Sequence, residues 1–354
     1  MKDKIIVFSF LAYLLFFSIA HVIFKDEVIS NMERRKLKEF PNITFTSDDI
    51  VNIEAYLLDH FPYREHFRKV KAMYNYHVMQ KLDNNGIYYE DDYIYKSNYP
   101  TNKKSVQYFL EHINKLSSMF NENNHVYTLV VPDKNYYLEG SNFLHLDYDY
   151  IYKEIKRLET NNIDIRNILN MSDYYKTDTH WRQENLDKVV KHLVDNMNLE
   201  YQSINYQKNC YDKFYGVYYG ESAINAGADK LCYLTNDLLN NVLVNYLENP
   251  KLHTVYNINK LDSLDSYEVY LDGASSYIEI INNNCSNNKE LVIFRDSFGS
   301  SITPLLIPYY SKITVIDNRY ISSDNFLKYI EFSNQDILFI YSTLIVNNSF
   351  SLKN

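Results

Sequence analysis

The sequence lacks the features that mark several common protein classes. Only three cysteines occur in 354 residues, with no Cys-x-x-Cys or histidine-rich spacing, so neither a disulfide framework nor a zinc site is indicated. At most one pair among Cys210, Cys232 and Cys285 can form a bridge, and three buried thiols are the simpler expectation. The formal charge of −9 argues against the concentrated basic face of a nucleic-acid-binding protein.

Glycine and proline are also scarce, with 7 residues each, whereas tyrosine is abundant at 36. This bias, together with many lysines, asparagines and isoleucines, indicates an AT-rich genome at least as much as a function. Exposed tyrosines would nevertheless suit stacking on sugar rings. No internal repeat and no low-complexity segment is found.

One long hydrophobic run is present, Ile5 to Phe24, with Lys2 and Lys4 before it and Lys25 after it. About 20 apolar residues suffice to span a bilayer. The run has no polar stripe, which disfavours a buried core helix. Ser18-Ile19-Ala20 resembles a signal-peptide cleavage site, but the apolar run continues beyond it, so we expect an uncleaved anchor.

The charges on the two sides of this run favour opposite orientations of the helix in the membrane. Lys2 and Lys4 favour a cytoplasmic N-terminus, whereas Arg34, Arg35 and Lys36 favour the opposite orientation. A short tail leading an anchor usually stays inside. We therefore expect a single-pass protein of the cell membrane whose residues after 25 are extracytoplasmic.

We expect three regions: a transmembrane anchor over 1–25, a juxtamembrane linker and helical region over 26–100, and a catalytic domain over 101–354. In the second region, Ser47-Asp48-Asp49 is typical of a helix start. A further helix is predicted over 63–82, and a hairpin-like element over 87–95.

From about residue 103, short apolar strands alternate with helices, which predicts a mostly parallel sheet covered on both faces. Strands are predicted over 125–131, 291–294, 313–316 and 337–341. Helices are predicted over 106–120, 148–158, 184–197, 300–309 and 322–331. The region 200–285 is harder to interpret, with a possible strand over 267–271.

Four polar segments directly follow strands of this sheet. They are Pro132-Asp133-Lys134, Asp296-Ser297, Asp317-Asn318-Arg319 and Ser342-Thr343. The carboxyl ends of parallel strands meet at one edge, where ligands bind. We expect these segments to converge there.

Ser297 is the best candidate nucleophile, in the motif Arg295-Asp296-Ser297-Phe298-Gly299. We expect Gly299 to permit a sharp turn that exposes the hydroxyl and aims backbone N–H groups at a reacting carbonyl, each such donor being worth about 3 kcal/mol. The motif is not the Gly-x-Ser-x-Gly of ordinary α/β-hydrolases. The alternative is that Asp296 and Ser297 only cap the next helix.

His180 is the candidate base and Asp178 the carboxylate that orients it, in the stretch Asp178-Thr179-His180-Trp181. A separation of two residues on a loop lets the carboxylate reach one ring nitrogen. Trp181, the only tryptophan, would provide a wall or a sugar-stacking surface. The alternative is a helix-start turn with an exposed histidine.

These two motifs together resemble the DHHW-motif proteins of Gram-positive bacteria, which belong with the alginate O-acetyltransferase family and its SGNH-hydrolase-like domain. Further matching segments are Glu33-Arg34-Arg35, Asp59-His60-Phe61-Pro62-Tyr63-Arg64, Val131-Pro132-Asp133-Lys134 and Ile316-Asp317-Asn318-Arg319-Tyr320. The similarity spans nearly the whole chain. It implies a three-layer α/β/α domain after the N-terminal helix.

The resemblance also implies a reaction, the transfer of an acetyl group to a polysaccharide hydroxyl through an acetylated serine. Carried over, the triad is Ser297, His180 and Asp178. The family's second histidine is replaced by Thr179, which leaves the triad intact. A membrane-bound O-acyltransferase partner would supply the acetyl group, and neither a metal nor a nucleotide is required.

Four further residues are weaker substrate-binding candidates. Lys134 and Arg319 would hold an acidic glycan or polarise the acyl carbonyl, and Tyr320, like Tyr136, would offer a platform for a sugar. For the two basic residues, the alternative is a surface charge or a charge paired with a carboxylate.

Two other functions fit the same residues. A carbohydrate acetylesterase would use the same triad but pass the acetyl group to water. A non-catalytic glycan-binding or assembly protein would keep the fold without turnover.

Overall fold

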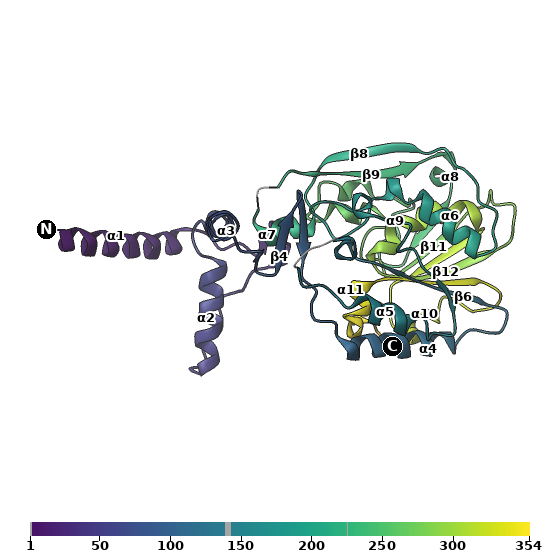
Figure 1. The fold of residues 1–354 in the computed structure, drawn as a ribbon, viewed down its shortest axis with the longest axis horizontal. Helices are drawn as coiled ribbons and strands as arrows, with labels where there is room; N and C mark the ends of the chain where they lie inside the picture. Colours follow the sequence, from purple (N-terminus) through teal and green to yellow (C-terminus); the bar gives the residue numbers. More distant parts are fainter. Residues whose placement is uncertain (1, 139–142, 225) are drawn as a thin grey trace. The chain divides into compact units, whose positions relative to one another are not determined.

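The computed structural model describes residues 2–138, 143–224 and 226–354 and divides into two compact units (Figure 1). Unit 1 comprises Met1–Ile87 and Tyr219–Ala226, and unit 2 comprises Tyr88–Tyr218 and Gly227–Asn354. This division differs from the expected boundary at residue 100, because residues 88–100 belong to unit 2. The segment 219–226 returns to unit 1, which local sequence patterns did not indicate.

Unit 1 begins with a long apolar helix, α1 (Lys2–Ile23), of which only Ala20 is buried. Its length and composition are those of a membrane-spanning helix. The elements that follow are β1 (Ile29–Ser30), β2 (Arg35–Lys36), α2 (Ser47–Asp59), α3 (Arg64–Met73), the π-helical turn η1 (Tyr74–Val78) and β3 (Asp83–Asn84). The two predicted helices are therefore present, although the second ends before Leu82.

Unit 2 is built on a seven-stranded sheet in the order β10-β11-β13-β12-β14-β6-β7. Its strands are β6 (His125–Val131), β7 (Asn161–Ile163), β10 (Leu243–Tyr246), β11 (Tyr277–Ile281), β12 (Glu290–Arg295), β13 (Lys312–Ile316) and β14 (Asp336–Ser342). The five strands from β13 to β7 pair in parallel, and β10 and β11 are antiparallel. The mostly parallel sheet is confirmed.

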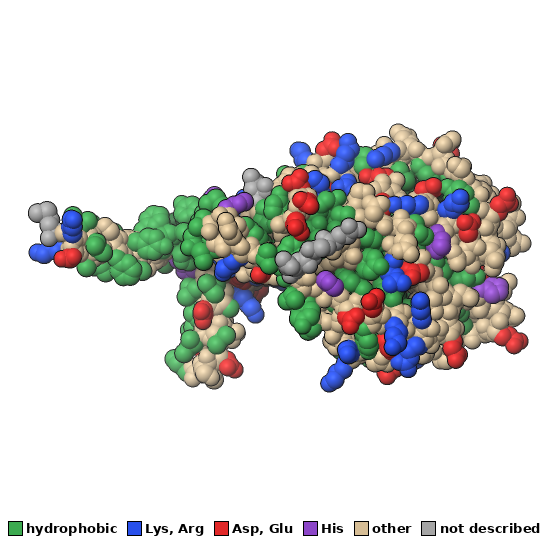
Figure 2. Space-filling view, viewed as in Figure 1, with side chains coloured by type: hydrophobic (Ala, Val, Ile, Leu, Met, Phe, Trp, Pro, Cys, Tyr) green, Lys and Arg blue, Asp and Glu red, His purple; other side chains and the backbone are tan. Residues whose placement is uncertain are grey.

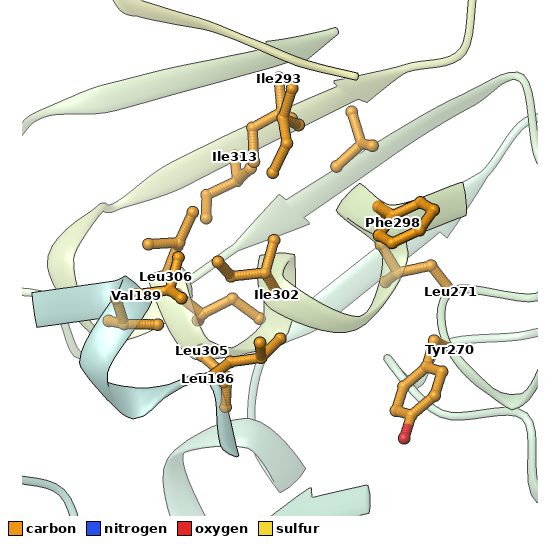
Figure 3. Packing of buried hydrophobic residues seen from close by; sticks show 14 of the residues in the cluster. Leu186, Val189, Tyr270, Leu271, Ile293, Phe298, Ile302, Leu305, Leu306 and Ile313 are labelled. Carbon is orange, nitrogen blue, oxygen red and sulfur yellow. The ribbon is translucent and has the colours of Figure 1, made fainter. Parts of the chain in front are cut away.

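Helices cover both faces of this sheet. On one face lie α4 (Lys103–Ser117), α5 (Tyr148–Ile155), α10 (Ser323–Phe326) and α11 (Thr343–Val346), packed on a buried apolar cluster. The other face carries α6 (Asp187–Asn196) and α9 (Ser297–Leu306), whose packing on Ile293 and Ile313 is shown in Figure 3. Strands buried on both faces are near-continuous apolar runs, which is why β12 and β14 were legible in the sequence. The three-layer α/β/α architecture is confirmed.

The region 200–285 contains structure that the sequence patterns missed. The expected strand over 267–271 is wrong, since Ser266–Val269 forms a 3₁₀ turn, η6. The strands here are β10, β11 and a separate antiparallel pair, β8 (Gln207–Phe214) and β9 (Asp229–Thr235). A disulfide joins Cys210 to Cys232 across that pair, and Cys285 is free. The expectation of three thiols is therefore wrong.

The predicted helix over 322–331 is also shorter than expected. After α10, the backbone continues with tighter bonds of the i to i+3 type, from Lys328 N to Asn325 O and from Tyr329 N to Phe326 O. The remaining elements are β4 (Ile87–Glu90), β5 (Tyr93–Lys96), η2 (Lys134–Tyr137), η3 (Met171–Asp173), η4 (Gln183–Asn185), α7 (Val217–Ser222), α8 (Asp237–Asn240), η5 (Ile258–Lys260), η7 (Ile307–Tyr309) and η8 (Ser349–Ser351).

Candidate active site

A tight loop carries both members of the Asp-x-His motif. Its two ends are held together by backbone hydrogen bonds from Tyr175 N to His180 O and from Arg182 N to Asp173 O, at 3.1 and 2.7 Å. This closure places residues 176–179 at the tip of the loop. The motif therefore does not start a helix, which was the alternative interpretation.

Asp178, His180 and Ser297 form one continuous hydrogen-bonded relay. The Asp178 Oδ1 atom lies 2.6 Å from His180 Nδ1, and His180 Nε2 lies 2.7 Å from Ser297 Oγ. Asp178 is 1% exposed, His180 is buried and Ser297 is half-buried. A carboxylate on Nδ1 fixes the tautomer whose Nε2 accepts the serine proton. The three side chains have the hydrogen-bonding geometry of a Ser-His-Asp triad.

The Asp178 carboxylate is held in its ionised form by its neighbours. Its Oδ2 accepts a hydrogen bond from Val217 N at 2.8 Å, and its Oδ1 accepts one from His180 N at 3.0 Å. Burial alone would raise the pKa of Asp178, but the His180 ring and these amides outweigh it, so the pKa lies well below its usual value. An ionised carboxylate stabilises the imidazolium that forms when the base takes a proton.

Lys134 is buried and its ammonium group donates hydrogen bonds to the backbone of this loop. Its Nζ donates to the carbonyl oxygens of Tyr175, Lys176 and Asp178 at 3.1, 3.0 and 2.7 Å. The side chain is 1% exposed, so the expectation that it binds an acidic glycan is wrong. Burial lowers the pKa of Lys134 to about 7 against the attraction of nearby carboxylates. Lys134 is a positioning residue for Asp178.

Replacing Lys134 with methionine is expected to lower both stability and turnover. The methionine has a similar length but donates no hydrogen bond, so the buried carbonyl groups of Tyr175 and Asp178 lose the Lys134 donor, each at a cost of about 1–3 kcal/mol. Lys176 O keeps its hydrogen bond from Ile94 N at 2.8 Å. Thermal unfolding and the rate of acetyl release from an activated acetyl ester measure the two effects. Lys230→Met is the control, since Lys230 is exposed and pairs with exposed Asp212. An unchanged melting temperature for Lys134→Met would contradict the positioning role.

Asp229, at the start of β9, holds the other side of the loop. Its carboxylate accepts from Lys176 N, from Thr177 N and from Thr177 Oγ1, at 2.7–3.0 Å, and it pairs with Arg182 at 2.7 Å. Asp229 was not identified from the sequence. It lies 49 positions after the histidine, in a region where no local pattern indicated a role.

Trp181 joins the histidine loop to the serine helix. Its indole Nε1 donates to Phe298 O at 3.1 Å and to Ser301 Oγ at 2.8 Å, both on α9. The ring is 0% exposed, so the expectation of a sugar-stacking surface is wrong. The wall around the imidazole includes Tyr267, whose ring stacks on His180 at 3.8 Å between centroids. Tyr267 was missed because it falls in the misassigned segment 267–271.

Ser297 is the first residue of α9, and Asp296 caps that helix by accepting from Phe298 N at 3.0 Å. The helix cap and the candidate nucleophile are therefore different residues. Asp296 provides the cap, and the Ser297 hydroxyl contacts His180. The N–H of a first helical residue has no partner within the helix, so Ser297 N is the oxyanion-donor candidate. Gly299 lies within α9 and does not make the turn. A Cβ there would lie 2.6 Å from Arg295 Cβ, so glycine lets α9 pack on β12.

Gly216 packs against Asp178 more closely than any side chain would allow. A Cβ atom at this position would lie 2.3 Å from the Cβ atom of Asp178 and 2.4 Å from Thr177 O. The neighbouring Val217 N is one of the two amide donors to the carboxylate. Glycine is therefore required at position 216, where the chain after β8 approaches Asp178.

Replacing Gly216 with alanine is expected to lower turnover about 100-fold, the cost of displacing a catalytic group by about 1 Å. The reason is that Asp178 must move away from the new methyl group. Turnover is measured by acetyl release from an activated ester. Gly227→Ala is the matched control, because a Cβ there meets nothing within 4 Å. Wild-type turnover in Gly216→Ala would show that this approach does not set the position of Asp178.

The strand ends converge as expected. Asp296 Oδ2 accepts from Ser342 N at 2.8 Å, and Asp133 Oδ2 accepts from Thr343 Oγ1 at 2.7 Å. Arg319 forms a two-point ion pair with Asp317, which also contacts the fully buried Arg295 at 3.3 Å. Burial would lower the pKa of Arg319, but the Asp317 pair raises it above its ordinary value. The carboxylate-paired alternative therefore describes Arg319.

Tyr320 remains exposed beside this pair, with the Arg319 guanidinium 5.3 Å from its ring centroid. A role for either residue in substrate binding stays a prediction. Within residues 2–138, 143–224 and 226–354, no group of three His, Cys, Asp or Glu side chains is arranged to hold a metal ion.

Comparison with known proteins identifies the fold. No protein-family model and no curated protein matches the sequence. A DHHW family protein from Eubacterium siraeum superposes with a TM-score of 0.64 at 20% identity, covering 77% of this chain and 97% of that one. Bacillus cereus PatB1 superposes with a TM-score of 0.60 at 20% identity over 74% and 97% of the two chains, and it has also been solved with a sulfonyl adduct. The resemblance to DHHW proteins is confirmed at the level of fold.

Proposed function

We propose that this protein is an extracytoplasmic O-acetyltransferase that acts on a cell-surface or secreted polysaccharide through an acetyl-Ser297 intermediate. The supporting observation is the relay of 2.6 and 2.7 Å from Asp178 through His180 to Ser297. A half-buried serine on such a relay is an activated nucleophile. The fold shared with the DHHW family protein is consistent with this assignment.

The reaction consists of two acyl transfers with one base. His180 Nε2 takes the Ser297 proton as Oγ attacks the acetyl carbonyl carbon, and the imidazolium then protonates the leaving group as its bond breaks. The acceptor hydroxyl next gives its proton to His180 while its oxygen attacks the acetyl-serine. Collapse of the second tetrahedral intermediate releases the sugar ester and returns the proton to Ser297. Backbone donors at the start of α9 would stabilise the oxyanion in both halves.

An extracytoplasmic location is supported by two independent features. The helix α1 is long and apolar enough to anchor the chain. The Cys210–Cys232 disulfide belongs to unit 2, and disulfides persist mainly in oxidising compartments. We therefore propose a single-pass membrane protein whose unit 2 lies outside the cytoplasm, with the acetyl group supplied by a membrane-bound O-acyltransferase.

A cleft of about 1440 Å³ in unit 2 is a candidate path for the polysaccharide acceptor. Its walls include residues 135–137 of η2, directly after Lys134, and residues 169–172, which lead into the histidine loop. Six tyrosines line it, Tyr93, Tyr95, Tyr99, Tyr136, Tyr137 and Tyr148. Tyrosine rings offer large, rigid contact surfaces with a polar tip. Tyr136 was one of the two expected sugar platforms.

The test is to trap and then discharge the intermediate. The purified protein is incubated with an activated acetyl ester, and mass spectrometry of the Ser297 peptide is expected to show an acetyl adduct. Oligosaccharides are then added, and an O-acetylated sugar establishes transfer, whereas free acetate alone establishes the acetylesterase. Absence of any Ser297 adduct, both with the ester and with a sulfonyl fluoride, would leave the non-catalytic glycan-binding function and overturn the proposal.

A further inference from the structure

The helix α3 presents its apolar side to the outside. Phe67, Val70, Met73, Tyr74 and Val78 lie on one side of α3 and η1, and each is between 43% and 62% exposed. Among the residues of α3 only Ala72 is buried. An amphipathic helix of a soluble protein turns its apolar side to the core. The arrangement here is the reverse.

Ion pairs fix this rotation of α3. Arg64 contacts Glu33 at 2.7 Å, and Arg68 contacts Glu65 at 2.7 Å and Glu33 at 3.4 Å. Arg68 also donates to the carbonyl oxygen of Gly220 at 2.8 Å. The charged side of α3 therefore faces unit 1 and contacts it. Burying the apolar side against unit 1 instead would break the contacts of Arg64 and Arg68 with Glu33 and of Arg68 with Gly220, whereas the Arg68–Glu65 pair lies within α3.

The exposed apolar side of α3 continues the surface of α1. Phe17 of α1 lies 5.1 Å from Phe61 and 5.8 Å from Phe67 between ring centroids, and Phe24 lies 5.3 Å from Tyr63. These aromatic contacts join the outer end of α1 to the start of α3. The two apolar surfaces therefore meet without a polar boundary at this point.

The neighbouring helix α2 extends the same surface. Ile50, Val51, Leu57 and Leu58 are between 42% and 71% exposed. Figure 1 shows α2 and α3 running crosswise to α1, and Figure 2 shows hydrophobic side chains over α1 and along α2. Helices that lie across a spanning helix at its end are positioned to rest along a bilayer surface.

We propose that α2 and α3 lie in the headgroup region of the bilayer that α1 crosses, with lipid covering their apolar sides. The inference rests on the membrane anchoring proposed above. Lipid is the occupant that fits, because the surface is continuous with a lipid-facing helix. Tyrosines at its border, Tyr63 and Tyr74, and the exposed Lys69 and Lys71 are also typical of membrane interfaces.

The test uses tryptophan substitutions in the full-length protein, reconstituted in vesicles of phosphatidylcholine and phosphatidylglycerol that carry bromine on the acyl chains. The native Trp181 is buried in unit 2 and gives the background. Val70→Trp and Tyr74→Trp are expected to lose about half of their added fluorescence to bromine placed near the headgroup, as befits a helix about 5–10 Å deep. Phe350→Trp, at an exposed position of unit 2, is the control and is expected to show no loss.

A fourth variant separates this proposal from the anchoring. Phe8→Trp replaces an exposed residue of α1 and is expected to be quenched by bromine deep in the bilayer. Quenching of Phe8→Trp without quenching at positions 70 and 74 would overturn the lipid contact of α3 and leave the anchor intact. Such a result would indicate a protein partner. No quenching at any position would overturn both.

Discussion

Replacing Ser297 with alanine is expected to lower acetyl transfer about 10⁴-fold or more, the usual effect of removing a triad nucleophile. The alanine has no oxygen to form the acyl intermediate, and His180 Nε2 loses the hydroxyl that lies 2.7 Å away. Because Ser297 is half-buried and Asp296 provides the helix cap, the fold should be retained. Turnover of an activated acetyl ester and mass spectrometry of the Ser297 peptide are the measurements.

Ser300→Ala is the matched control for this experiment. Ser300 lies on the same helix and is buried, and it has no part in the relay. It is expected to keep wild-type turnover and an acetyl adduct on Ser297. If Ser297→Ala turned over as fast as the wild type, the nucleophile would be elsewhere and the proposed mechanism would fail.

The second large effect is expected from Asp178→Asn. The amide has the same shape as the carboxylate, so packing against Gly216 is preserved, but it carries no charge. An amide N–H facing His180 Nδ1 forces the proton to Nε2, which then cannot accept from Ser297. A fall in turnover of about 10⁴-fold is expected from this wrong tautomer. The loss should appear in kcat, measured with the activated ester.

Asp212→Asn is the control for the charge change, since Asp212 is exposed and pairs with exposed Lys230. It is expected to leave kcat unchanged. The melting temperature of Asp178→Asn should fall, because the NH2 group that faces His180 Nδ1 also faces His180 N, which loses its acceptor, and Val217 N keeps only a neutral acceptor. Full activity of Asp178→Asn would show that the carboxylate does not orient the base.

The candidate triad could be predicted from the sequence because its residues lie in two short motifs, one with Asp178 and His180 and the other with Ser297. Buried strands are marked by apolar runs, and the parallel sheet brings their ends together. Asp178-x-His180 does not follow a strand of the sheet, so its meeting with Ser297 was predicted from the need of a serine nucleophile for a base and from the resemblance to DHHW-motif proteins. Identifying the core strands required only that they are buried on both faces. The same logic correctly indicated that Asp133 and Asp296 would share one edge.

The residues that hold the triad in place could not be predicted from the sequence, because their roles depend on burial and residue spacing does not reveal burial. Lys134 has the composition of a surface charge, yet three backbone carbonyls surround it. Trp181 was expected to form a wall or a sugar-stacking surface, and the structure encloses it against α9. Gly216, Asp229 and Tyr267 lie in the region whose short, partly polar strands resemble loops. Their pairing partners are distant in sequence, so no local pattern contained the information.

The two hydrogen bonds of the Trp181 indole have a consequence for how the protein fluctuates. They connect the loop that carries His180 to α9, which carries Ser297. Thermal motion therefore moves the two segments together. The distance between His180 Nε2 and Ser297 Oγ therefore changes less than the position of either segment alone.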